Sequence, residues 1–104
     1  MLRIVTATAL LVATGTAGWA ADGAVVYKAN CAKCHGDTGH ADTPVGKALK
    51  VPPLAGNADV VKMSEADTAT RIKANEKHKA FVKSLSDDDV AAAAAYVKQL
   101  AAGK

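Results

Sequence analysis

Two cysteines and a histidine stand together in the segment Cys31-Ala32-Lys33-Cys34-His35. Two residues between the cysteines let one helical turn carry both thiols to the same side, where they can form thioethers with the two vinyl groups of a porphyrin. The histidine directly after the second cysteine then lies under the iron and supplies an axial imidazole. The spacing therefore predicts one covalently attached haem c, bound through Cys31 and Cys34, with His35 as the proximal iron ligand.

Other uses of a cysteine pair fit this chain less well. A disulfide is common in exported proteins, and two cysteines at this spacing also occur at thioredoxin-like redox sites. However, His35 follows the second cysteine directly, and the sequence has no series of β-branched strands from which to build a thioredoxin sheet. Structural zinc would need two further ligands in a matching pair, and the chain has only these two cysteines. The disulfide and metal interpretations stay as minor alternatives.

The first twenty residues have the layout of a cleavable secretory signal. Arg3 supplies an early positive charge, and residues 4–18 are uncharged and mostly apolar. The small residues Gly18 and Ala20 precede the expected cut, and polar Asp22 follows it. We therefore expect residues 1–20 to be removed and residues 21–104 to form one exported domain, in the bacterial periplasm, without a stable membrane span. An uncleaved amphipathic first helix is the alternative.

The exported part carries little charge and few aromatic side chains. Without Arg3 it has 12 basic and 10 acidic residues, a net charge of +2. This charge is too small to indicate a nucleic-acid partner, and no basic run is interleaved with aromatics. Much of the apolar content is alanine, and a domain of this size usually needs a cofactor or a cross-link to complete its core. The composition therefore also favours a haem.

The rest of the sequence predicts an all-α fold with three main helices. Apolar residues recur at helical spacing over residues 23–32, which lead into the cysteine motif. Ser64-Glu65-Ala66-Asp67 resembles a capping box, with aspartate as a shorter substitute for glutamate at the third position, and it begins a second helix that runs to about Asn75. Ser86, followed by three aspartates, begins the last helix. The inner positions expected on the last two helices are Ala66, Ala69, Ile72, Val90, Ala93, Ala94, Val97, Leu100 and Ala101.

Three further segments connect these helices. Residues 36–56 contain four glycines and three prolines, and we expect a long loop that wraps one edge of the haem. Residues 58–63 are expected to form a single helical turn. Residues 76–85 are rich in lysine and are expected to be a plain connection.

On these motifs the chain resembles the class I cytochromes c of the short bacterial monohaem type. Tyr27, four residues before Cys31, matches the aromatic residue of the family's first helix, Gly23 its small helix-crossing residue, and Tyr96 the aromatic of its last helix. The resemblance implies the small cytochrome c fold, with long loops wrapped around one haem, and a single-electron carrier rather than an enzyme. It also implies that the carbonyl of Pro52 accepts the N–H of the proximal histidine.

The chain departs from this family at the sixth iron ligand. The family usually presents a methionine in a Met-Pro-Ala-Phe segment ahead of the last helix, and the corresponding segment here is His78-Lys79-Ala80-Phe81. We therefore expect His35 and His78 to ligate the iron together. Two imidazoles favour Fe(III) more than an imidazole and a thioether do, so the reduction potential is expected to be low.

Two other residues are candidates for the distal position. Met63 is the fallback sixth ligand, although a methionine directly before a helix cap is more often core filler. His40 lies so soon after His35 that it cannot easily reach the opposite haem face, and we expect it on the surface. A weakly bound or open sixth position would instead suit a gas sensor or a peroxidase-like enzyme.

Seven lysines stand in or near the segments that should frame the haem edge. Most are accounted for as ordinary solvated side chains, but together they suit a docking rim for an acidic redox partner protein. Such a rim would act on encounter rate and would be weakened by salt. We expect a monomer, with a subunit of a larger exported redox complex as the alternative. The seven residues are Lys28, Lys33, Lys47, Lys50, Lys77, Lys79 and Lys83.

Overall fold

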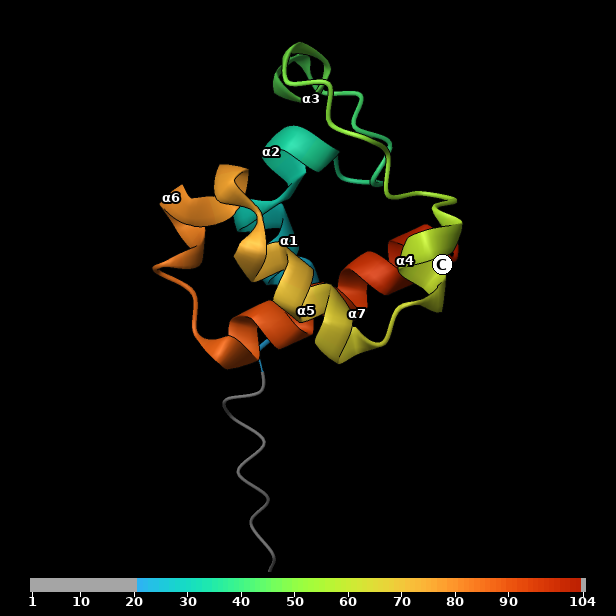
Figure 1. Cartoon of the computed structure of the whole chain (residues 1–104). Helices are drawn as coiled ribbons and strands as arrows, with labels where there is room; N and C mark the ends of the chain where they lie inside the picture. The colour runs from blue at the N-terminus through green and yellow to red at the C-terminus, as the bar shows by residue number, and fades with distance from the viewer. Residues whose placement is uncertain (1–20, 104) are drawn as a thin grey trace, which may run out of the picture.

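The computed structural model describes residues 21–103, so the predicted signal peptide, residues 1–20, lies outside the described part. Within residues 21–103 the chain is helical and has no strand, which confirms the expected all-α class (Figure 1). None of these helices is long and apolar enough to cross a bilayer. In chain order the elements are α1 (Gly23–Asn30), α2 (Ala32–His35), α3 (Pro44–Ala48), α4 (Ala58–Lys62), α5 (Glu65–Ala74), the 3₁₀ helix η1 (Glu76–His78), α6 (Lys79–Val82) and α7 (Asp87–Ala101).

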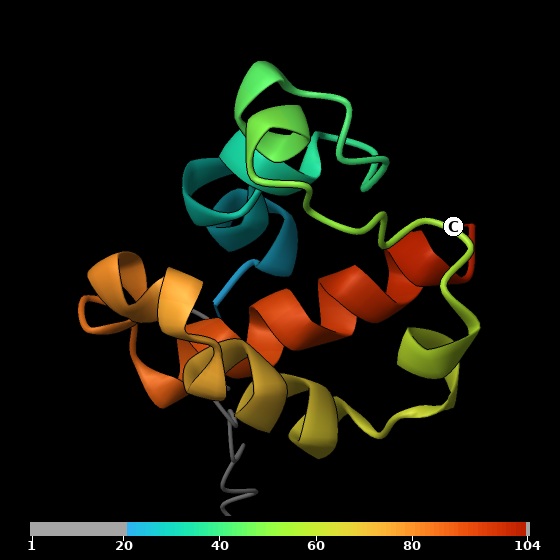
Figure 2. The same cartoon turned by 45° about the horizontal axis from the view of Figure 1, so that its top comes forward.

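Helix α7 is the platform of the fold. It packs against α1 and against α5, and the C-terminal end of α7 also contacts α4 (Figures 1 and 2). Its inner face is the one that the sequence predicted, and the buried positions are Val90, Ala93, Ala94, Val97, Leu100 and Ala101. Because most of these side chains are small, neighbouring helices can approach α7 closely.

The crossing of α1 and α7 is close enough to require a glycine. A Cβ atom at Gly23 would lie 2.3 Å from the carbonyl oxygen of Ala92, far inside van der Waals contact. One turn further along α1, the fully buried ring of Tyr27 packs on Tyr96 with ring centroids 5.1 Å apart. The roles expected for these three matched residues, a small crossing residue and an aromatic pair, are confirmed.

The start of α7 is set by a reciprocal capping box. The hydroxyl of Ser86 accepts a hydrogen bond from the Asp89 N–H, and the Asp89 carboxylate accepts one from the Ser86 N–H, both at 3.1 Å. This arrangement satisfies two backbone donors and places acidic residues at the positive end of the helix. At Ser64 only half of the expected capping box is formed: the Ser64 hydroxyl accepts from the Asp67 N–H at 3.0 Å, without the return bond to the Asp67 carboxylate.

The inner face expected on α5 was partly wrong. Ala66 is exposed, whereas Thr68 is only 4% exposed and is the buried residue of this helix. The Thr68 hydroxyl donates to the Ser64 carbonyl at 2.9 Å, so a polar side chain can be buried here without losing its hydrogen bond.

The structure also differs from expectation at the end of the first helix and in two of the connecting segments. The first helix ends at Asn30, and Cys31 separates it from the short α2. Residues 36–56 contain α3, which begins with the Thr43 hydroxyl accepting from the Gly46 N–H, and residues 76–85 contain η1 and α6. The expected turn over residues 58–63 is confirmed as α4.

Candidate functional site

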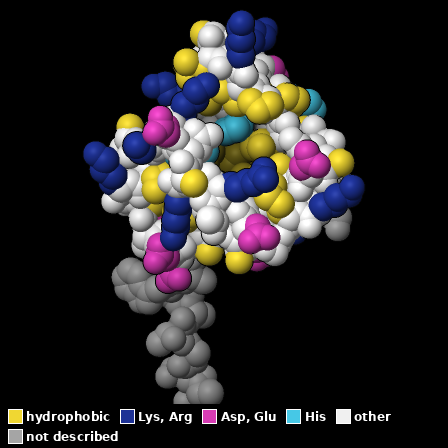
Figure 3. All heavy atoms as spheres, viewed as in Figure 1, with side chains coloured by type: hydrophobic (Ala, Val, Ile, Leu, Met, Phe, Trp, Pro, Cys, Tyr) yellow, Lys and Arg dark blue, Asp and Glu magenta, His cyan; other side chains and the backbone are white. Residues whose placement is uncertain are grey.

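One cavity brings the predicted site residues together. It has a volume of about 340 Å³, in the range of about 300–1,000 Å³ typical of cofactor sites. Figure 3 shows it as a hollow in one face of the molecule, with apolar walls and histidine at its floor. The predicted residues that line it are Cys31, Cys34, His35, Pro52, Met63 and His78. Its apolar walls are formed mainly by Leu49, Val51, Leu54, Val60, Ile72, Phe81 and Val97.

A single helical turn presents the two thiols. The N–H groups of Cys34 and His35 both donate to the Cys31 carbonyl, at 3.2 and 3.0 Å, and this bonding closes the turn. Both cysteines are free thiols. Burial, followed by the neighbouring Cys34, raises the pKa of the Cys31 thiol to about 11, so it is neutral in the unmodified chain. The turn therefore offers two unpaired sulfurs and one imidazole to the same cavity.

The back of this turn is held by contacts that the sequence analysis missed. The buried Tyr27 hydroxyl donates to the Gly36 carbonyl at 2.6 Å, and the Thr43 hydroxyl donates to the Lys33 carbonyl at 2.7 Å. A Cβ atom at Gly46 would lie 2.2 Å from the Cys34 carbonyl oxygen, so α3 packs directly on α2. The Thr43–Pro44 pair is a helix-start signal that could have revealed α3 from the sequence.

His35 lines the cavity with a neutral imidazole. Burial, followed by the charge of His78, lowers the pKa of His35, and the neutral ring is the form that binds a metal ion. Its Nδ1 atom is buried and has no hydrogen-bond partner in residues 21–103. The bond expected from this ring to the Pro52 carbonyl is therefore not formed in this structure. Pro52 is exposed and lines the cavity.

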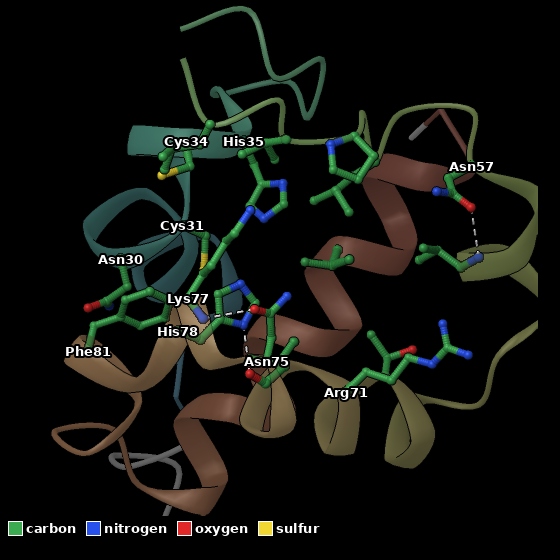
Figure 4. Close-up of a pocket in the computed structure, with 18 of the residues that line it drawn as sticks. Asn30, Cys31, Cys34, His35, Asn57, Arg71, Asn75, Lys77, His78 and Phe81 are labelled. Atoms are coloured by element: carbon green, nitrogen blue, oxygen red, sulfur yellow. Dashed lines mark hydrogen bonds between the residues drawn. The ribbon is translucent and has the colours of Figure 1, made fainter. Parts of the chain in front are cut away.

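His78 faces His35 from the other side of the cavity. It lies at the end of η1, and its Nδ1 atom is 2.7 Å from the Ile72 carbonyl oxygen. The centres of the two imidazole rings are 6.3 Å apart, with the rings inclined at 63°. The ring of Phe81 packs against His78 with centroids 5.2 Å apart. Figure 4 shows both imidazoles directed into the space between α2 and η1, so they can bind one metal ion between them.

The other two candidates for the distal position are placed differently. Met63 is half-buried, packs against the core cluster and lines the same cavity, so it stays a geometric alternative to His78. Its backbone carbonyl accepts a hydrogen bond from the Lys98 ammonium group. His40 is exposed and bonds to the Thr38 hydroxyl at 2.7 Å, which confirms its expected surface position.

Comparison with known proteins agrees with this geometry. Residues 18–97 match the family model described as cytochrome c oxidase, cbb3-type, subunit III. The chain belongs to the class I cytochrome c family. It is 39% identical over 100 residues to cytochrome c6 of Picosynechococcus sp. (strain ATCC 27264 / PCC 7002 / PR-6), an alignment that covers 88% of this chain and 85% of that relative. No solved structure matches the chain significantly.

As a class I cytochrome c, the protein binds one haem c through Cys31 and Cys34, and the cavity fits that group. Haem c carries its thioethers on one edge and its two propionate carboxylates on the opposite edge. In the view of Figure 4, the two cysteines lie on one side of the imidazoles, and Arg71 and Asn57 lie on the other. A guanidinium suits a carboxylate because it can donate two parallel hydrogen bonds. Arg71 was not singled out from the sequence.

The hydrogen bond between Tyr27 and Gly36 is expected to stabilise the haem-binding turn of this cytochrome c. Tyr27→Phe removes this bond and leaves the Gly36 carbonyl with only the 3.2 Å bond from the Gly39 N–H, so the variant should lower the free energy of unfolding by about 0.5–1.5 kcal/mol. Tyr96→Phe is the matched control, because Tyr96 is the other ring of the same aromatic pair and is half-buried. Guanidinium unfolding of both haem-loaded variants, followed by haem absorbance, measures the difference. Equal losses in the two variants would contradict this role.

Proposed function

We propose that the chain is an exported single-electron carrier in which His35 and His78 bind the haem iron from opposite sides. The observation that carries this proposal is the 6.3 Å separation of the two imidazole centres across the cavity. Metal–imidazole bonds are about 2.0 Å long and a ring nitrogen lies about 1.1 Å from the ring centre, so two imidazoles on one metal ion have centres about 6 Å apart. The observed spacing therefore leaves room for an iron ion and little else along this line.

The residues around the iron suit electron transfer rather than bond-making chemistry. The iron of haem c supplies a one-electron couple between Fe(II) and Fe(III). His35 and His78 would fill both axial positions in both oxidation states, so no position is left for a substrate. Apolar side chains line the cavity and keep water from the iron, which reduces the reorganisation that accompanies each change of charge.

The same ligand pair implies a low reduction potential within the family. An imidazole is a better donor to Fe(III) than a thioether is, so replacing the usual methionine with His78 stabilises the oxidised state. Met63 lines the cavity as well, and a bond from its sulfur to the iron would raise the reduction potential instead. The spectrum and the potential therefore test the same assignment.

The axial ligands can be assigned by spectroscopy on four proteins. The oxidised wild-type protein should be low-spin without a far-red sulfur-to-iron band, and Met63→Leu should leave its spectrum and potential unchanged. His78→Ala should lose the low-spin signal and bind carbon monoxide rapidly when reduced. His78→Met should introduce the sulfur band and raise the potential by on the order of 0.1 V. Absorption, electron paramagnetic resonance and redox titration are the measurements.

Two outcomes would refute this assignment. A far-red sulfur band in the wild type that disappears in Met63→Leu would make Met63 the sixth ligand and the protein a higher-potential carrier. Rapid, tight binding of carbon monoxide to the reduced wild type would mean an exchangeable sixth position, as a gas sensor or a peroxidase-like enzyme requires.

We also propose that lysines around the cavity form the docking rim for an acidic redox partner. All seven of the lysines named in the sequence analysis are exposed, and Figure 3 shows basic side chains around the mouth of the hollow. Lys77 lines the cavity itself. Lys79 is partly neutralised by Glu76, 3.5 Å away. The positive charge would therefore steer negatively charged partners toward the exposed part of the haem.

Reduction by small iron complexes of opposite charge tests the docking rim. The rate with an anionic complex should fall several-fold as salt rises, and the rate with a cationic complex should rise. Lys77→Glu should slow the anionic reagent more than Lys62→Glu does, since exposed Lys62 lies at the end of α4, outside the rim. Stopped-flow rates that are independent of ionic strength, or equal in the two variants, would rule out the rim.

The proposal of export rests on the first twenty residues. Their early charge, apolar run and small residues before Ala21 are those of a cleaved signal, and haem attachment of this type takes place outside the cytoplasm. The haem protein purified from the periplasm should therefore begin at Ala21 and carry one haem. N-terminal sequencing and mass spectrometry check this, and a chain that begins at Met1 would contradict both the cleavage and the boundary at residues 20 and 21.

A further inference from the structure

The junction between α5 and η1 is organised by a single residue, Asn75. Its backbone is extended, with φ −70° and ψ 123°, and this conformation ends the helix. Its side-chain oxygen accepts from the Lys77 N–H at 2.9 Å, and its carbonyl accepts from the His78 N–H at 3.0 Å. Its own N–H donates to the Arg71 carbonyl at 3.2 Å. Asn75 thus closes one helix, starts the next and fixes the backbone of His78.

Ending α5 at this point releases one particular carbonyl. In a continuing α-helix the Ile72 carbonyl would accept from the N–H four residues later, at Glu76. The extended Asn75 prevents this bond, so the Ile72 carbonyl is one of the unpaired acceptors that every helix end must satisfy. The side chain of His78 satisfies it, with Nδ1 2.7 Å from the oxygen.

This hydrogen bond determines which nitrogen of His78 is free. A carbonyl oxygen can only accept, so Nδ1 carries the proton and Nε2 carries the lone pair of the neutral ring. Figure 4 shows the other ring nitrogen of His78 on the side that faces His35 and the cavity. The ring is therefore held in the tautomer and the orientation that a metal ligand needs.

We propose that Asn75 is the positioning residue of the distal ligand, acting through the Ile72 carbonyl. The inference rests on the proposed function, in which His78 binds the iron. A hydrogen bond from Nδ1–H to a carbonyl makes an imidazole a stronger donor, and strong donors favour Fe(III). Asn75 therefore orients the ring of His78 toward the cavity and keeps the reduction potential low.

A matched pair of variants tests this role. Asn75→Ala removes the cap of η1, and Ser86→Ala removes a helix cap elsewhere, because the Ser86 hydroxyl accepts from the Asp89 N–H at the start of α7. Ser86 does not line the cavity, so this control removes a cap without changing a residue beside the haem. Asn75→Ser, which keeps a neutral capping oxygen, is the conservative variant. The haem-loaded proteins are compared by redox titration and by carbon monoxide binding after reduction.

In Asn75→Ala we expect the preference of the distal site for Fe(III) to fall about tenfold, which is a rise of about 59 mV in the potential. Carbon monoxide should also bind this variant faster than the wild type. Ser86→Ala should lose a similar amount of thermal stability without either change, and Asn75→Ser should return toward the wild-type values. Because the potential reports on the iron and not on stability, a merely structural role for Asn75 would not move it.

Two results separate this inference from the proposed function. If Asn75→Ala behaves like Ser86→Ala while the wild type shows two imidazole ligands, the positioning role of Asn75 is wrong and the ligand assignment stands. If the wild type shows a sulfur-to-iron band, His78 is not the ligand, and the proposed function and this inference fall together.

Discussion

Two imidazoles from distant parts of the chain meet across one cavity, 6.3 Å apart. His35 ends the turn that follows α1, and His78 ends the short helix that follows α5. A small domain in which half of the buried hydrophobic residues are alanines has little apolar area with which to hold such segments together. A haem in this cavity would contact both histidines and the apolar walls at once. The group that carries the electron therefore also completes the core, and folding and haem binding are coupled.

The two histidines stand on segments that follow helices packed against α7. Helix α1 rests on α7 at Gly23, where only a glycine permits the approach, and it carries the cysteine turn. Helix α5 packs against α7, buries Thr68 and leads into η1. The exposed ion pair between Lys73 and Asp87 joins the end of α5 to the start of α7, but its contribution to stability is small. Each histidine thus lies in the short segment after a helix that packs against α7.

The sequence was sufficient where structure is decided locally. The cysteine motif, the helix start at Ser86 and the apolar face of α7 all follow from short-range spacing, and all were predicted; the reciprocal bond of Asp89 at that start was not. The errors lie where a distant segment decides the outcome. Thr68 is buried in a helix that packs against α7, and it lines the cavity, which its own neighbours in the sequence do not reveal. Helix α3 is the exception, because Thr43 and Pro44 marked its start locally. The Pro52 bond was inferred from resemblance, and the position of that carbonyl depends on the path of a long, glycine-rich segment that no local pattern specifies.

The two histidines are held by different means, and the difference follows from their surroundings. His35 follows two cysteines that bind the haem covalently, so its position is fixed even though its Nδ1 atom has no hydrogen-bond partner in residues 21–103. No residue next to His78 is bonded covalently to the haem. Its ring is instead held by the hydrogen bond between Nδ1 and the Ile72 carbonyl. A hydrogen bond can open reversibly and a thioether cannot. If His35 and His78 bind the iron as we propose, the His78 face is therefore the one that can exchange its ligand, and exchange there would open a site for gas binding.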